Sequence, residues 1–431
     1  MLDRNGMIND SGFNRWNHRW NQKTTIGMKL FDLAVLWYYC FGGSIVLRPM
    51  VSVFWPVMSV IGLFVFRMRL IRTDKYKELA ILMIAVISVS TIYSVSSAST
   101  IKYALSILLY FVIALEITSR KDNIVFFLNA LWVYSLLLLM VTFIEKYAPA
   151  LYLSTFINLL PTAYRSDIHT FMLNGSVNGF FNQTSSNAVA MSLGVCVSFY
   201  KFICEKRSKA KKIACFIVML AFIYGIVLTV RRASLLAVIL ILTIFLYSSY
   251  GNTLTKLLVI FAALGLILFG GISTIPFLSN IVSKTMSDAA AGDISDGRFT
   301  IWMKCFQLFS KRPILGYGAD SLQSDFAQVN NAHNSFIQSL VELGMVGAIV
   351  FFAPFIYGFL TSIKTYIRRK ELNVGDQPLV VAALFWQMYN FINAMFEALF
   401  AGETTVFMMF IMQMTIMQII LNPRMNAAEM S

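Results

Sequence analysis

The sequence is poor in charge. Only 13% of its 431 residues are Asp, Glu, Lys or Arg, whereas about 25% is usual for a soluble globular chain. Hydrophobic residues make up 58% of the chain, and they come in blocks of roughly 20 residues, the length that crosses a bilayer as a helix. This composition excludes a soluble enzyme and predicts an all-α integral membrane protein.

Cysteine and histidine are also scarce. The five cysteines show no C-x-x-C spacing, which argues against a disulfide framework or a zinc site. Four of them lie in or beside apolar blocks, where a thiol behaves as a small hydrophobe. Of the three histidines, His18 precedes the first apolar block, while His169 and His333 lie in the long polar segments described below. A lone histidine in a loop is more often a solvated side chain than a catalyst.

The apolar blocks predict about twelve transmembrane helices. They cover 30–47, 50–66, 79–97, 101–118, 124–144, 187–204, 212–230, 234–250, 257–275, 335–360, 378–396 and 404–422. The chain then divides into an N-terminal arm (1–29), helices one to nine (30–275) with a loop at 145–186, a second loop (276–334), helices ten to twelve (335–422) and a tail (423–431). Loops as long as these two usually carry function.

The charges predict which side each segment occupies. With both termini in the cytoplasm, the inside holds 24 basic and 11 acidic residues, while the outside holds 11 and 10. The net charge of +14 is therefore almost wholly the positive-inside pattern of a plasma-membrane protein, and it needs no nucleic-acid partner. Both long loops are expected to be extracytoplasmic.

A short amphipathic helix is predicted within the second loop. In the stretch IWMKCFQLF, the residues Ile301, Phe306 and Phe309 are apolar, and Lys311-Arg312-Pro313 should end the helix. We expect this helix to lie along the outer membrane surface, beside a Gly-Tyr-Gly turn.

His333 lies among amide side chains at the expected membrane boundary, in NNAHNSFIQ. An imidazole fixed there can hold or move a proton, which favours a catalytic role. The alternative is that the same Asn-rich stretch only caps a helix that begins near Asn334 or Ser335.

Two adjacent arginines, Arg231 and Arg232, separate two apolar blocks on the side where positive charge is scarce. Arginine suits a lipid diphosphate because its planar fork donates two parallel hydrogen bonds and stays charged. The alternative is a pair of side chains that snorkel to lipid headgroups. Further basic residues could widen the patch: Arg48, Arg298, Lys311 and Arg312.

The carboxylates on the outside do not form the clusters that a divalent-cation diphosphate site needs, and there is no D-x-D motif. Asp293 and Asp296, in GDISDGR, come nearest, and a solvated loop is the favoured interpretation. The sequence thus predicts no metal and no other cofactor.

Three stretches of the sequence resemble motifs of the O-antigen ligase and O-antigen polymerase superfamily. VRRASLLA resembles its S-R-x-x-L-L-A element, and NGFFNQTSSNAVAM its G-F-x-x-x-N stretch. RFTIWMKCFQLFSKRPILGYG followed by AHNSFIQSLVELGMVG resembles its outer loop. The motifs cover roughly residues 175–360, and the rest of the chain resembles the family only in its number of spans.

The resemblance implies a metal-independent membrane glycosyltransferase of the GT-C type, with a polyprenyl-diphosphate-linked glycan as donor at the outer face of the plasma membrane. Arg232, Arg298 and His333 match the family's two arginines and its histidine. Arg231 replaces the serine of the S-R element, which leaves open which arginine contacts phosphate. The remaining substrate-binding candidates are Arg231, Arg48, Lys311, Arg312, Asn334 and Glu342. The resemblance also implies membrane lipid, a chain-length regulator and a flippase as partners.

Two functions share this machinery. A polymerase of O-antigen, capsule or exopolysaccharide joins lipid-linked repeat units, whereas a ligase transfers the finished glycan to the phosphorylated lipid A core. The loop 276–334 carries five basic and five acidic residues, and this neutrality favours the less charged acceptor of a polymerase. A transporter or flippase is less favoured, because Asp32, Glu78, Glu116 and Glu342 lie nearer span ends than centres.

Overall fold

The computed structural model describes residues 23–42, 50–66, 74–250, 297–322, 329 and 331–421, and throughout these ranges the regular structure is helical. Eleven of the twelve predicted spans coincide with helices; the remaining one, 257–275, lies outside the described residues. These helices are α2 (Ile26–Phe41), α3 (Val51–Val60), α4 (Lys75–Ser90), α5 (Ser97–Ile117), α6 (Lys121–Tyr147), α9 (Thr184–Cys204), α10 (Lys209–Leu228), α11 (Arg232–Tyr250), α16 (Ser335–Ile367), α17 (Gln377–Asn393) and α18 (Glu403–Leu421). Six helices of the described part are long and apolar enough to cross a membrane: α5, α6, α9, α10, α16 and α18.

Some boundaries differ from the prediction. The first helix was expected at 30–47, but α2 ends at Phe41, where the Gly42 N–H closes the last turn by donating to the Tyr38 carbonyl at 2.7 Å. The tenth span was expected to end at 360, but α16 continues to Ile367. It does so because its last turns still pack on the core, where Tyr366 is buried.

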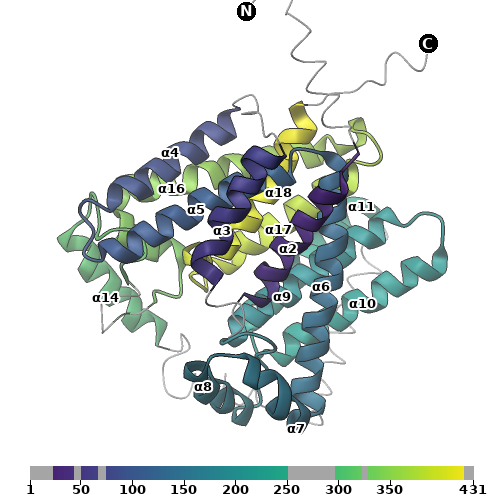
Figure 1. Ribbon diagram of the computed structural model, residues 1–431, viewed down its shortest axis with the longest axis horizontal. Helices are drawn as coiled ribbons and strands as arrows, with labels where there is room; N and C mark the ends of the chain where they lie inside the picture. Colours follow the sequence, from purple (N-terminus) through teal and green to yellow (C-terminus); the bar gives the residue numbers. More distant parts are fainter. Residues whose placement is uncertain are drawn as a thin grey trace, which may run out of the picture.

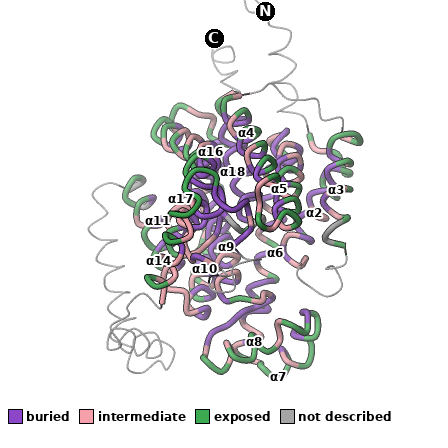
Figure 2. The backbone as a smooth tube through the Cα atoms, turned by 90° about the vertical axis from the view of Figure 1, so that its left-hand side faces the viewer, coloured by how far each residue is buried: buried purple, intermediate pink, exposed green. Residues whose placement is uncertain are grey.

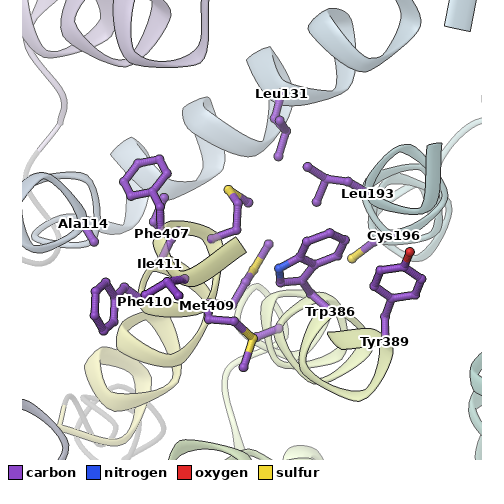
Figure 3. Packing of buried hydrophobic residues seen from close by; sticks show 14 of the residues in the cluster. Ala114, Leu131, Leu193, Cys196, Trp386, Tyr389, Phe407, Met409, Phe410 and Ile411 are labelled. Atoms are coloured by element: carbon purple, nitrogen blue, oxygen red, sulfur yellow. The ribbon is translucent and has the colours of Figure 1, made fainter. Parts of the chain in front are cut away.

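Helix α18 forms the centre of the bundle and packs against α5, α16 and α17 (Figure 1). In its apolar window 83% of the residues are buried, against 28% in that of the peripheral α10. Figure 3 shows Phe407, Met409 and Phe410 of α18 and Trp386 of α17 in the same buried hydrophobic cluster. The peripheral helices instead carry many exposed apolar residues, and the tube coloured by burial shows exposed stretches along them (Figure 2). This is the pattern of helices that face lipid tails.

Small residues let neighbouring helices approach closely. A Cβ atom on Gly194 of α9 would lie 2.3 Å from the Phe222 ring of α10, and one on Gly358 of α16 would lie 2.5 Å from the Gln413 amide of α18. Close backbone approach at small residues is how helices associate where lipid removes the hydrophobic driving force.

Helix α16 is broken at Gly344, and the loop that precedes the His333 segment docks into this break. Gly344 has φ +66°, and the next residue, Met345, donates its N–H to the Pro313 carbonyl at 2.8 Å. Gly318, also with positive φ, donates to the Glu342 carbonyl at 2.7 Å. The Gly-Tyr-Gly turn is therefore fixed to α16 rather than free in solvent.

The predicted amphipathic helix is present as α14 (Arg298–Lys311), and it ends at Lys311 as expected. One face, with Ile301, Cys305 and Phe309, packs on α16 and on the loop between α14 and α16. Phe306, another apolar residue of the predicted helix, is 47% exposed and lies on a second apolar face with Phe299. Positions 301, 305 and 309 follow one helical face, and position 306 lies off it. An exposed apolar face fits the predicted position at the membrane surface.

The loop 145–186 is folded and contains α7 (Pro149–Leu151) and α8 (Thr162–Leu173), which project from one end of the bundle (Figure 1). The buried Glu145 carboxylate accepts the backbone N–H of Asn178 at 3.0 Å and also that of Gly179. The Tyr152 hydroxyl donates to the Gly179 carbonyl at 2.8 Å. These bonds fix the G-F-x-x-x-N stretch and hence the start of α9.

Candidate functional site

Three side chains from separate turns, Arg231, Arg298 and His333, meet around the carboxylate of Glu397. Glu397, in the turn after α17, accepts a hydrogen bond from Arg231 Nη1 at 3.1 Å. His333 Nδ1 lies 3.4 Å from its other oxygen, and Arg298 Nη2 lies 3.9 Å from the first. Arg231 precedes α11, Arg298 begins α14, and His333 precedes α16. The charge pattern of the sequence assigns all four turns to the same side of the membrane.

Burial and charge act in opposite directions on the Glu397 carboxyl, whose side chain is 13% exposed. Burial by itself would raise its pKa, because desolvation disfavours the charged form. The hydrogen bond with His333 and the charges of Arg231 and Arg298 outweigh burial, and the pKa of Glu397 lies below its usual value. Glu397 is therefore an anion at neutral pH.

The N-terminus of α9 joins the same cluster through Arg231. The Arg231 Nε donates to the Thr184 hydroxyl at 2.7 Å, and Thr184 is the first residue of α9. The first turn of a helix carries unpaired N–H groups and a partial positive charge. Positive potential from the helix and from two guanidinium groups thus converges at this point.

The backbone is strained on both sides of the cluster. Val230, directly before Arg231, has φ +60°, which is rare for a β-branched residue, and His333 has φ +48°. The His333 N–H donates to the Asn331 side chain at 2.7 Å, and Trp302 of α14 donates to the Ala332 carbonyl at 2.9 Å. Strained residues that neighbouring bonds hold in place are typical of functional sites.

A cavity of about 420 Å³ adjoins the cluster. Glu397 is the charged residue among the described side chains that line it. The wall includes the polar residues Asn331, Gln183 and Ser185, and it also includes apolar residues of α2, α6 and α9. A cavity with both a polar and an apolar wall fits an amphiphilic ligand.

The other predicted residues lie in different places. Arg232 is the first residue of α11 and is half-buried. Lys311 and Arg312 are exposed at the far end of α14, about 20 Å from Arg298 by helical rise. His169 is exposed on α8. Arg48, His18, Asp293 and Asp296 lie outside the described residues.

Two of the predicted substrate-binding residues, Asn334 and Glu342, hydrogen-bond to backbone groups of the fold. Asn334 is the N-cap of α16, because its side-chain oxygen accepts the N–H groups of Phe336 and Ile337. The buried Glu342 carboxylate accepts the backbone N–H of Asp320 at 3.1 Å and of Leu322 at 3.3 Å. Glu342 therefore ties the loop to α16, and the partner that the structure gives to His333 is Glu397.

Glu397 was not singled out from the sequence. It is an isolated acid in MFEALF, and its partners lie 64 to 166 residues away. The available signal was topological, because an acid in an outside turn between two apolar spans must lie at the same membrane side as the arginines. Within the described ranges, no three His, Cys, Asp or Glu side chains are grouped as a metal site would require.

The fold and the site define a class: a multi-pass helical membrane protein with an arginine, histidine and carboxylate cluster at one end of the bundle. Residues 216–352 match the family model described as O-antigen ligase, a segment that includes Arg231, Arg298 and His333. This match confirms the resemblance to the O-antigen polymerase and ligase superfamily. It indicates a ligase- or polymerase-type glycosyl transfer with a polyprenyl-linked glycan substrate in a lipid setting. No curated protein matches the chain.

Proposed function

We propose that the protein is a polysaccharide polymerase that joins polyprenyl-diphosphate-linked repeat units at the outer face of the plasma membrane. The observation that carries this proposal is the convergence of Arg231, Arg298 and His333 on Glu397 beside a cavity with polar and apolar walls. Guanidinium groups suit the diphosphate, and the cavity suits sugar and lipid.

The proposed reaction is a displacement at the anomeric carbon of the donor. The acceptor hydroxyl oxygen forms the new bond to that carbon, while the bond from the carbon to the diphosphate oxygen breaks and its electron pair leaves with the diphosphate. Arg231 and Arg298 would stabilise the charge that builds on the leaving group. His333 would either take the hydroxyl proton or, when protonated, donate to the diphosphate. In this proposal the arginines replace a metal ion.

The contacts favour Arg231 over Arg232 as the phosphate ligand. Arg231 joins Glu397 and the first residue of α9, whereas the family's arginine element aligns with Arg232. We therefore assign the phosphate contact to Arg231 and keep Arg232 as a second basic group at the start of α11.

A ligase is the second candidate, since the matching family model carries that description. The outer loop's balance of five basic and five acidic residues supports the polymerase, because lipid A core is more strongly phosphorylated than a repeat unit. Deletion of the gene separates the two functions. A polymerase mutant should display single repeat units, whereas full-length chains that accumulate on the polyprenyl carrier would identify a ligase.

A further inference from the structure

Glu397 is an unexpected group in a site that should receive a diphosphate, because it places a negative charge among the cations. Its carboxylate faces both guanidinium groups and lines the cavity. A carboxylate next to an anionic ligand weakens binding by charge repulsion unless it moves or gives up its partners. The geometry of its contacts indicates that Glu397 can give up its arginine partners.

The ion pairs around Glu397 leave much of each guanidinium group unused. Arg231 offers Glu397 a single nitrogen, Nη1, while its Nε donates to Thr184. Arg298 is 3.9 Å away, beyond hydrogen-bond distance. Neither arginine makes the paired, fork-like contact that holds a carboxylate most strongly. Both side chains are also partly exposed, at 29% and 22%.

We infer that Glu397 is the resident counter-ion of the donor site: it holds Arg231 and Arg298 while the site is empty, and the diphosphate of the donor replaces it on both guanidinium groups. This inference rests on the proposed function. A diphosphate carries more charge than one carboxylate and presents several oxygens to each planar fork, so the exchange favours the ligand. Glu397 then keeps His333 as its partner and holds the imidazole in place.

A counter-ion role and a purely structural role of Glu397 predict opposite changes in the affinity for a diphosphate. If Glu397 only positions the arginines, E397Q disorders them and weakens binding of a diphosphate. If Glu397 competes with the ligand, E397Q removes the competitor and leaves two cations without their anion, so binding becomes tighter. His333 loses its carboxylate partner in both cases, and transfer activity falls.

The test measures farnesyl diphosphate binding to the purified full-length protein in detergent, by titration calorimetry at low salt. We expect E397Q to bind at least about tenfold more tightly than the wild type, with a transfer rate that is strongly reduced. Asp167→Asn is the matched control, because it removes an exposed carboxylate on α8 and should change neither value. Equal or weaker binding by E397Q, with intact binding by the wild type, overturns the counter-ion role.

The proposed function fails in a different way, because in that case the wild type itself does not bind the prenyl diphosphate. If E397Q does not fold, infrared difference spectra of the wild type and E397D decide the matter. Addition of farnesyl diphosphate should shift a carboxylate stretching band in the wild type, and the position of that band should differ in E397D. A spectrum without a carboxylate shift overturns the inference.

Discussion

Arg231 Nη1 lies 3.1 Å from Glu397 Oε1, although the two residues are 166 positions apart in the chain. The contact joins the start of α11 to the turn after α17. Since Arg298 and His333 reach the same carboxylate, this pair marks the point where separate turns of the bundle meet. The predictions below follow from that meeting point.

Arg231 should matter more than Arg232. Replacing Arg231 or Arg298 with Lys keeps the charge but loses the planar fork, and we expect glycan chain formation in cells to fall about a hundredfold. Arg232→Lys should have a smaller effect. Chain length on gels, with protein level checked by immunoblot, measures this. A strong loss in Arg232→Lys with a normal Arg231→Lys would return the phosphate contact to Arg232.

Gly344 should be intolerant of a side chain. It has φ +66°, and a Cβ there would lie 2.2 Å from the Ile314 carbonyl oxygen. Gly344→Ala should cost about 3 kcal/mol and detach the loop that carries Arg298, so both thermal stability and activity should fall. Gly27→Ala is the control, because its Cβ would meet the Phe66 ring at 3.5 Å and the Thr25 hydroxyl at 4.0 Å, both ordinary contact distances. Equal melting temperatures for the two variants would contradict the docking of the loop at the break in α16.

The ion pairs of Glu397 should make stability depend on pH at the acid end. Because the pKa of Glu397 lies below its usual value of about 4.3, its contribution is present at neutral pH and is lost as the pH falls through the folded-state pKa. The melting temperature of the wild type should exceed that of E397Q at pH 7, and the gap should close below about pH 4. A gap that stays constant down to pH 3 would show that the carboxylate charge does not stabilise the cluster.

The positive-inside pattern predicts opposite sides for two accessible positions. Cysteine placed at Ser208, before α10, should be labelled only from the cytoplasm, and cysteine placed at Asp167 on α8 only from outside. Native Cys204 is exposed close to Ser208, so both variants need Cys204→Ser as background. The same labelling pattern at both positions would refute the membrane orientation and the outward site.

The sequence was sufficient for the helices and for part of the site. Hydropathy located the helices because lipid requires long apolar segments, and Lys311-Arg312-Pro313 marked the end of α14. The capping role of Asn334 was one of two interpretations, and the structure shows the N-cap. Helix α14 has two apolar faces, one with Ile301 and Phe309 and one with Phe306, and the sequence does not show which of them packs on protein.

Glu397 could not be assigned from the sequence because its role depends on contacts between distant turns. The sequence also does not show in which direction the side chains of Arg231 and Arg232 point. The left-handed backbone at Val230 directs the chain so that Arg231 reaches Glu397 and Arg232 begins α11. No sequence pattern predicts such a conformation at a β-branched residue.

The most direct test of the central claim is glycan transfer by the purified protein in vesicles that contain polyprenyl-diphosphate-linked repeat units. The account predicts longer lipid-linked glycans together with free polyprenyl diphosphate, and activity that survives EDTA. His333→Ala and Arg298→Ala should abolish both products while the protein remains folded. Turnover that is lost on chelation and restored by magnesium or manganese would contradict the metal-free mechanism. Undiminished transfer by both variants would contradict the site itself.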